Sequence, residues 1–351
     1  MEYGSRFEWS SNQPFLRETG AGLDFDNASY YRSGRDAMKA LARAKGHKCD
    51  TVLLPALCCE SMMTPFTLNG YKVGFYRMNG DCTGNTRDVL EKMTDRTILL
   101  YMRYFGIKPF GDEFLTGIKA KFGGALLAED RTHDILVPRS GEEFKPDAML
   151  ASLKKWAALP DGGILVTELE TERGITDTRY CDVRRAAKEK KDIYLQSYEP
   201  ALKKEFLSQL TAAEAYLDES GVPVGISGEY RELIGHIDFV EILRRRRENI
   251  ATLTECLRPA LAEGKIRLLT EHPEDSGLYL SILLDNNRAV QRKAAESGVY
   301  CAVIWPRPEE TKGICPESDR IIDHLLCLPC DQRYGEKEMK FIAGCVLDAL
   351  P

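Results

Sequence analysis

The chain has 351 residues, of which 43% are hydrophobic and 29% are charged, and its formal net charge is −6 at pH 7. This length allows two domains that share an interface, and the composition is that of an ordinary globular protein. Interspersed charges give no basic surface for nucleic acid or an anionic membrane, and no apolar run approaches the roughly 20 residues of a membrane-spanning helix.

The N-terminus and the cysteines indicate a cytoplasmic protein. The first residues lack the basic start and apolar core of a signal peptide. The eleven cysteines are scattered and odd in number, which favours reduced, buried thiols. Cys327 and Cys330 have a Cys-x-x-Cys spacing, but no second ligand pair accompanies them. A structural role is therefore favoured over a zinc or redox site, and we expect no metal.

The N-terminal part predicts an irregular arm followed by an α/β domain. Residues 1–25 contain aromatic anchors but no regular pattern. Strand and helix signals then alternate, which favours a mostly parallel sheet with helices on both faces. The predicted strands are 51–54, 72–76, 97–102, 125–128, 147–153 and 163–167, and the predicted helices are 37–44, 60–68, 87–93 and 112–122.

The C-terminal part predicts helices and then a smaller α+β unit. Residues 169–220 are charged and helical, with 188–192 as a solvated stretch. A long helix from about 231 to 261 follows, and its four consecutive arginines, 244–247, are typical of a solvated face. The predicted divisions are an arm (1–25), a large domain (26–235) and a small C-terminal domain (236–351). The small domain's predicted strands are 265–269, 279–284, 300–305 and 325–328, and its closing helix is 336–350.

Lys155 lies in a segment that has the pattern of a Schiff-base site. An apolar strand leads to the lysine, a turn rich in Pro, Asp and Gly follows, and a second apolar strand leaves at residue 163. A lysine among apolar neighbours loses hydration of its ammonium, so its pKa falls and the free amine becomes a nucleophile toward carbonyl groups. Lys154 is a competing candidate, although alternation along a strand would send the two lysines to opposite faces.

Asp130 supplies the second half of this pattern. An apolar run ends on Glu129 and Asp130, and His133 follows three positions later. A carboxylate at the carboxyl end of a strand, where α/β sheets place ligands, can keep a pyridine nitrogen protonated. Lys155 for the aldehyde and Asp130 for the ring nitrogen together predict pyridoxal 5′-phosphate (PLP) as the cofactor. Taken alone, Asp130 also fits a helix N-cap, and His133 fits a hydrogen-bonded structural group.

With these residues placed, the chain resembles the fold-type I PLP enzymes, and among them the DegT/StrS sugar aminotransferase family. The resemblance runs from about Ser33 to the end of the chain. The spacing to the glycine pair favours Lys155 over Lys154 as the Schiff-base lysine. It implies an α/β fold with a large domain built on a mostly parallel seven-stranded sheet and a smaller α+β domain. The matching segments are 33–37, 54–59, 103–106, 129–133, Lys155 with Gly162 and Gly163, 229–231 and 327–330.

The resemblance also implies roles for individual residues. Lys155, Asp130 and His133 would be catalytic, with His133 near the cofactor ring or its phenolic oxygen. Backbone N–H groups at a helix start and one hydroxyl would bind the phosphate. The implied cofactor-binding residues are Gly34, Arg35, Cys59, Asp130, His133, Ser152 and Lys155, and the substrate-binding candidates are Tyr104, Trp305, Arg307, Arg333 and Tyr334.

Three departures place the chain in a divergent branch of the family. Relatives stack an aromatic ring on the cofactor where this chain has Cys59. The asparagine that crosses the dimer interface to the phosphate in relatives corresponds to Glu229. Ser152 also lies closer to the lysine, as if the segment between them were two residues shorter.

The resemblance implies an aminotransferase that moves an amino group from a donor such as glutamate to a keto-sugar, nucleotide-linked, in amino-sugar biosynthesis. A homodimer with its sites at the interface is expected, and the N-terminal arm could reach toward the partner subunit. Two alternatives stay open: a PLP enzyme of this fold with another reaction, such as a decarboxylase or lyase, or another acceptor, and a non-catalytic regulator. Lys155 argues against the sugar-dehydrating relatives, which carry histidine there.

Overall fold

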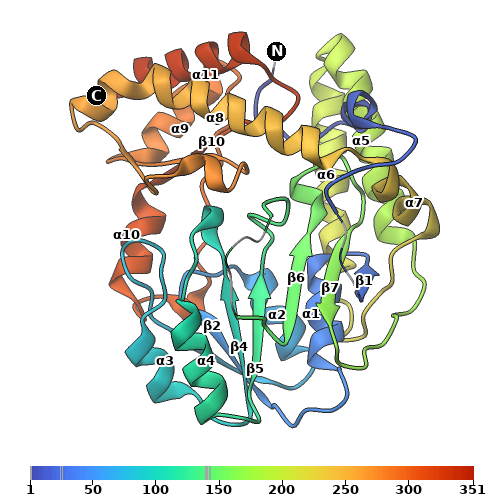
Figure 1. The fold of residues 1–351 in the computed structure, drawn as a ribbon. Coiled ribbons are helices and arrows are strands. Elements are labelled where there is room, and N and C mark those ends of the chain that lie inside the picture. The colour runs from blue at the N-terminus through green and yellow to red at the C-terminus, as the bar shows by residue number, and fades with distance from the viewer. Residues whose placement is uncertain (1, 24, 26, 139–140, 142–143) are drawn as a thin grey trace.

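The computed structural model describes residues 2–23, 25, 27–138, 141 and 144–351. A seven-stranded sheet occupies the lower half of the molecule as drawn in Figure 1, and a three-stranded sheet with its own helices lies above it. Among the described residues, no helix has both the length and the apolar character needed to cross a bilayer.

The large sheet is mostly parallel, as predicted. Its spatial order is β1-β7-β6-β5-β4-β2-β3, and only β7 runs against its neighbours. The central strands are almost wholly buried because helices cover both faces. The strands are β1 (Ala28–Tyr31), β2 (Thr51–Pro55), β3 (Lys72–Tyr76), β4 (Thr97–Met102), β5 (Leu126–Asp130), β6 (Ala148–Ser152) and β7 (Gly163–Thr167).

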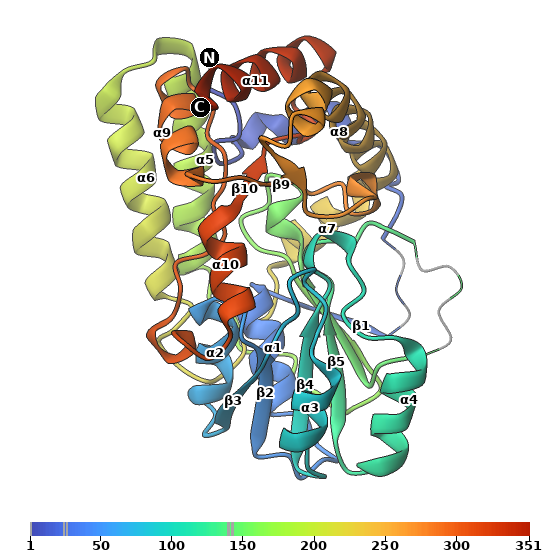
Figure 2. The same ribbon diagram turned by 90° about the vertical axis from the view of Figure 1, so that its left-hand side faces the viewer.

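Helices α1 (Gly34–Ala42) and α2 (Glu60–Thr67) cover one face of this sheet, and α3 (Thr86–Lys92) and α4 (Asp112–Lys121) cover the other (Figure 2). The sequence predicted these four helices and six of the seven strands to within a few residues. It missed β1, a short edge strand whose antiparallel pairing with β7 brings α1 next to the end of β6.

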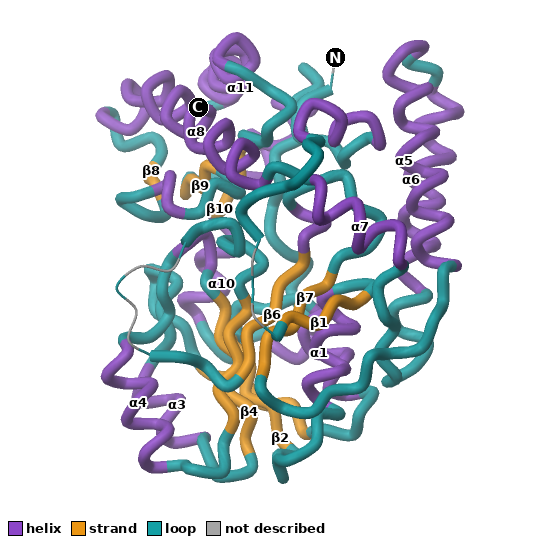
Figure 3. The backbone as a smooth tube through the Cα atoms, turned by 45° about the vertical axis from the view of Figure 1, so that its right-hand side comes forward, coloured by secondary structure: helices purple, strands orange, loops and turns teal. Residues whose placement is uncertain are grey.

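A helical hairpin stands beside the sheet and leads to the smaller unit. Its helices, α5 (Arg179–Ser197) and α6 (Pro200–Ala215), lie side by side (Figure 3). The next predicted element, one long helix, is wrong: the structure has α7 (Gly228–His236) and α8 (Phe239–Ala262). The break occurs because the N-terminal arm bonds to the chain there, with Asp238 N–H donating to the Phe15 carbonyl at 2.9 Å.

The C-terminal unit has a three-stranded antiparallel sheet of order β10-β9-β8. Its strands are β8 (Arg267–Leu268), β9 (Leu280–Leu283) and β10 (Leu325–Leu328), and its helices are α9 (Asn287–Glu296), α10 (Pro316–His324) and α11 (Glu336–Ala349).

One prediction for this unit is wrong, and two of its helices were not predicted. The segment 300–305 is not a strand. The Tyr300 N–H donates to the Tyr3 carbonyl of the arm at 2.8 Å, and within this segment only Ala302 forms a β-bridge, with Cys327. Helices α9 and α10 were missed. One hydrophobic cluster lies around the seven-stranded sheet and extends to Ile304, Ile321 and Leu325 of the C-terminal unit. A second cluster lies in the C-terminal unit, and a third, which includes Trp156 and Phe239, also joins the two units. The domain boundaries at residues 25 and 235 remain predictions.

Candidate active site

A cavity of about 250 Å³ opens at the carboxyl edge of the large sheet, beyond β4, β5 and β6 and beside the start of α1. This is the edge at which open α/β sheets bind ligands. Its lining residues are Arg6, Ser33, Gly34, Arg35, Met38, Cys59, Ser61, Met62, Met102, Asp130, Thr132, Ser152, Lys154, Lys155, Arg184, Glu214, Leu217 and Trp305.

A short, anchored turn delivers Lys155 to this cavity. Strand β6 ends at Ser152, and a 3-10 turn (Leu153–Lys155) follows. Gly162 has φ +124°, which favours glycine, and its carbonyl accepts the Leu153 N–H at 2.8 Å. Trp156 is fully buried and donates its indole N–H to the Thr132 carbonyl at 2.9 Å. Burial lowers the pKa of Lys155, while Cys59 and Asp130 oppose that change.

Lys154 also lines the cavity, so the argument that alternation would separate the two lysines is wrong. The physical reason is that both residues lie in the turn and not in the strand. The ammonium of Lys154 donates a hydrogen bond to the Tyr180 hydroxyl. Burial, followed by the nearby Arg184, lowers the pKa of Lys154 to about 7. Lys154 is directed toward α5, whereas Lys155 is coupled electrostatically to Asp130.

Asp130 is the last residue of β5 and is 3% exposed. One of its carboxylate oxygens accepts the Thr132 N–H at 2.8 Å. Burial raises the pKa of Asp130, and the hydrogen bonds from Thr132 and the charge of Lys155 oppose this. A cation at this point would therefore stabilise the ionised carboxylate. The protonated ring nitrogen of a pyridine is such a cation.

His133 follows Asp130 by three positions and is fully buried. Within the described part of the chain, neither ring nitrogen has a hydrogen-bond partner. The imidazole packs instead against Phe105 and Trp305, with ring centroids 4.9 and 5.7 Å away. Burial, with a smaller effect of Lys155, holds the pKa of His133 well below its ordinary value. The ring is thus a neutral group with hydrogen-bonding capacity to spare, although it is not among the residues that line the cavity.

The start of α1 also lines this cavity, through Ser33, Gly34 and Arg35. Ser33 caps this helix, and its hydroxyl accepts the Asp36 N–H at 3.1 Å. Gly163 lets the segment approach closely, because a Cβ there would overlap the Ser33 carbonyl. Gly34 lies against Ser152, so the free N–H groups of the first turn and the Ser152 hydroxyl converge. Such a helix start is suited to a phosphate group.

Trp305 places an aromatic ring beside the candidate lysine. The Lys155 ammonium lies 5.9 Å from the Trp305 ring centroid, and the Tyr104 ring lies 6.0 Å from it. Tyr104 is buried, and its hydroxyl donates to the Leu57 carbonyl. Cys59 lines the same cavity, with its sulfur 2.8 Å from the Ser61 hydroxyl oxygen.

The other substrate candidates are placed differently. Arg333 pairs with Asp331 and Glu8, both at 2.8 Å, and lines a second cavity. Arg307 lines neither cavity, because its guanidinium pairs with Asp319 at 3.0 Å and Asp323 at 3.3 Å. Tyr334 holds the N-terminal arm through its hydroxyl, which accepts the Gly4 N–H at 2.8 Å.

Glu229, which corresponds to the interface asparagine of relatives, is exposed at the start of α7 and pairs with Arg185 at 3.2 Å. Cys327 and Cys330 are buried free thiols. Among the residues that the structure describes, no group of His, Cys, Asp and Glu is arranged to hold a metal ion.

The second cavity, of about 350 Å³, adjoins the first and shares Arg6, Lys154, Lys155, Arg184 and Trp305 with it. The N-terminal arm, α5 and the C-terminal unit form its walls. Sequence reasoning missed this site: Arg6 is in a segment without regular structure, and α5 was predicted to be solvated around residue 188.

Two of the residues that were predicted to be solvated are in fact buried. Lys188 and Lys191 are 4% and 1% exposed because the arm covers α5, and Lys188 donates to the Phe7 carbonyl at 3.1 Å. In the arginine run of α8, Arg244 and Arg245 do pair with Glu241 on an exposed face. Arg246, by contrast, is 1% exposed.

No protein-family model matches the chain, and no curated protein does either. Solved structures do match. PseC from Helicobacter pylori, an aminotransferase involved in the biosynthesis of pseudoaminic acid, aligns with a TM-score of 0.64 and 14% identity over 100% of this chain and 99% of that one. DesI, solved in the presence of its TDP-sugar product, aligns with a TM-score of 0.65 and 17% identity over 97% and 88%.

A putative sugar aminotransferase from Streptococcus pneumoniae, in its PLP form, aligns with a TM-score of 0.61 and 14% identity over 92% of this chain and 88% of that one. At these identities the likeness shows the fold. The chain therefore has the fold-type I architecture that the sequence predicted.

Proposed function

We propose that this chain is a PLP-dependent aminotransferase that transfers an amino group to a keto-sugar. The observation that carries the proposal is the single cavity that brings together Lys155, Asp130 and the start of α1. The fold of known sugar aminotransferases supports it, as do six of the seven cofactor-binding residues predicted from the sequence, which line this cavity; His133 does not.

The residues present fit PLP. Asp130, buried and in need of a cation, suits the ring nitrogen, while the N–H groups of Gly34 and Arg35 and the Ser152 hydroxyl suit the phosphate. Bound PLP supplies an electron sink for the carbon from which a proton is removed. The Lys155 amine suits the aldehyde and, because burial lowers its pKa, can hold or release a proton at Nζ beside that carbon.

The buried Trp156 indole and the Ser33 cap would orient these groups. His133 offers a neutral nitrogen next to the site, and Trp305 offers an aromatic surface beside Lys155. Relatives stack an aromatic side chain on the cofactor at the position of Cys59. Trp305 would partly take over this role, because an aromatic ring packs favourably on another π-system.

The finer parts of the proposal concern the acceptor and the assembly. The acceptor would be a nucleotide-linked keto-sugar and the donor glutamate; in support, DesI was solved with a TDP-sugar product. The active form would be a homodimer in the cytoplasm, in keeping with eleven free cysteines. Light scattering of the purified protein measures the assembly, and a monomeric, active enzyme would contradict that part.

Spectroscopy of the purified protein tests the reaction. With PLP bound, addition of glutamate should remove the visible band of the lysine-bound cofactor and produce the amino form of the cofactor, and 2-oxoglutarate should accumulate. A decarboxylase or lyase would release carbon dioxide or an eliminated group and leave the cofactor in its aldehyde form. A non-catalytic regulator would show no change with any amino donor.

A further inference from the structure

We propose that the second cavity is an anion subsite in which Arg6, Arg184 and Lys188 bind a phosphate group of the acceptor. This inference rests on the proposed function, which identifies the ligand as the amino acceptor. The subsite adjoins the candidate lysine and opens into the same space. It adds the residues that recognise the charged part of the substrate.

Two of the three cations come from one face of α5. Arg184 and Lys188 are four residues apart and are 6% and 4% exposed, and both line the cavity. Arg184 donates one hydrogen bond to Glu214 at 3.0 Å, while its Nε is buried without a partner among the described residues. Lys188 makes a single hydrogen bond in this part of the structure, to the Phe7 carbonyl. Both side chains therefore have donors to spare in a place that is shielded from water.

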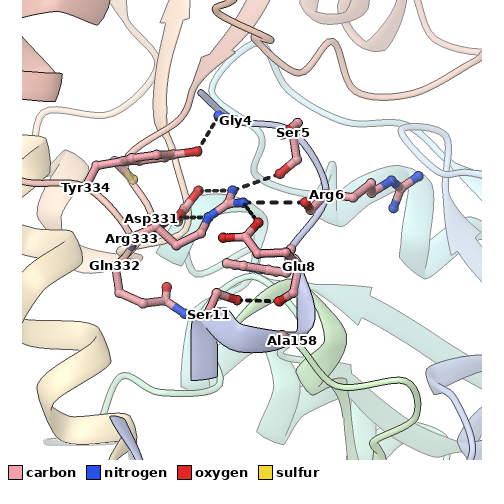
Figure 4. Close-up of polar contacts among 12 residues, drawn as sticks. Gly4, Ser5, Arg6, Glu8, Ser11, Ala158, Asp331, Gln332, Arg333 and Tyr334 are labelled. Carbon is pink, nitrogen blue, oxygen red and sulfur yellow. Dashed lines mark hydrogen bonds and ion pairs between the residues drawn. The ribbon is translucent and has the colours of Figure 1, made fainter. Parts of the chain in front are cut away.

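The third cation comes from the N-terminal arm. Tyr334, Arg333 and Lys191 hold the arm in place: the Arg333 guanidinium donates to the Ser5 carbonyl at 2.8 Å, and Lys191 donates to the Arg6 carbonyl. Figure 4 shows the Arg6 side chain extending away from this cluster. Its guanidinium makes no ion pair among the described residues and lines both cavities. The arm is thus a fixed wall that carries a free arginine.

The charge around the second cavity calls for more than one negative charge. Its lining includes seven basic residues and one acidic residue, Asp331. Arg333 is neutralised by Asp331 and Glu8, and the single carboxylate of Glu214 is shared by Arg35 and Arg184. Because unpaired buried cations are costly, burial lowers the pKa of Lys154, Lys155 and Lys188, and a bound dianion would favour their protonated forms. The basic residues of the lining are Arg6, Lys154, Lys155, Arg184, Lys188, Arg246 and Arg333.

A phosphate group satisfies these requirements better than a carboxylate. It offers three or more acceptor oxygens to guanidinium and ammonium donors and carries up to two charges. A lone carboxylate would leave part of the positive charge uncompensated. The subsite therefore predicts an acceptor that bears a phosphate or diphosphate next to its carbonyl-bearing part.

Calorimetric titration of the PLP-loaded holoenzyme with inorganic pyrophosphate tests the subsite, since the loaded cofactor already fills its own phosphate site. Arg6→Ala and Lys188→Met should each weaken binding about tenfold or more, which is the loss of a charge-assisted hydrogen bond. Lys190→Met is the matched control, because Lys190 is on the same helix but outside both cavities. Binding to this control should be unchanged within about twofold. Thermal melts confirm that each variant is folded, and Arg6→Ala, at an exposed position, keeps the test open if Lys188→Met does not fold.

Each outcome separates the subsite from the proposed function. Loaded enzyme that reacts with glutamate but does not bind pyrophosphate, or binds it equally after Arg6→Ala and Lys188→Met, refutes the subsite alone. Displacement of pyrophosphate by succinate at similar concentration shows a carboxylate site and refutes the phosphate assignment. Protein that never loads PLP refutes the proposed function, whatever it binds in the second cavity.

Discussion

Replacement of Lys154 by methionine gives the clearest physical prediction, because the structure places an ammonium where it is poorly solvated. The pKa of Lys154 falls from 10.5 to about 7 through burial and the neighbouring Arg184, against weaker opposing effects of Glu214 and Asp36. At about 1.4 kcal/mol for each pH unit between these two values, protonated Lys154 costs about 4–5 kcal/mol of folding free energy.

The sign of the effect follows from the two pKa values. Below about pH 7, Lys154 is protonated in both the folded and the unfolded chain, so the full cost is present. Between pH 7 and 10.5 only the unfolded chain binds the proton, so the free energy of unfolding rises with pH. Lys154→Met removes this cost and also the hydrogen bond to Tyr180, which contributes about 1 kcal/mol.

We therefore expect cofactor-free Lys154→Met to be more stable than the parent protein by about 3 kcal/mol at pH 6, with the difference vanishing near pH 10. Urea unfolding at several pH values measures this difference. Lys48→Met, at an exposed lysine, is the control and should track the parent protein throughout. A stability difference that does not change with pH would refute the burial of the Lys154 ammonium.

Three further predictions follow from the site. Asp130→Asn should keep the fold and bind PLP but slow the reaction with glutamate about 10²–10³-fold, measured by stopped-flow absorbance; an unchanged rate would contradict the role of the carboxylate. Arg246→Met should lower the free energy of unfolding by about 2–4 kcal/mol. The substitution removes a charged donor 2.8 Å from Gln332 and the contacts to the carbonyls of the lysine turn. An unchanged midpoint in urea unfolding would contradict this. Ser33→Ala should lower the free energy of unfolding by about 1 kcal/mol, because the Asp36 N–H loses its cap, and should weaken PLP binding. An undiminished affinity in a fluorescence titration with PLP would argue against phosphate binding at this helix start.

Local sequence pattern was sufficient for the sheet and for the centre of the site. Strands β2 to β7 are short apolar runs bounded by turn residues. The central strands β2, β4, β5 and β6 carry little alternation because both of their faces are buried. Asp130 and Lys155 could be found because Asp130 ends one such run and Lys155 lies three residues after the end of another. Because β7 pairs antiparallel with β6, the chain turns directly after β6, and both lysines lie in this turn. The alternation argument had assumed that they lie in a strand.

Contacts between distant segments explain what was missed. Lys188 and Lys191 have the sequence context of a solvated helix face, and only the arm, more than 180 positions earlier, buries them. The same arm ends the predicted long helix at Asp238. Arg246 looks like its exposed neighbours in sequence, but the turn after Lys155 and Gln332 surround it. Such burial depends on tertiary packing, which a local pattern does not encode.

Borohydride reduction of the PLP-loaded protein, followed by peptide mass mapping, tests the central claim most directly. The account predicts one reduced adduct, on Lys155, in the parent protein and in Lys154→Met, and none in Lys155→Ala, which should also lack the visible band of the lysine-bound cofactor. An adduct on Lys154, or a visible band that persists in Lys155→Ala, would contradict it.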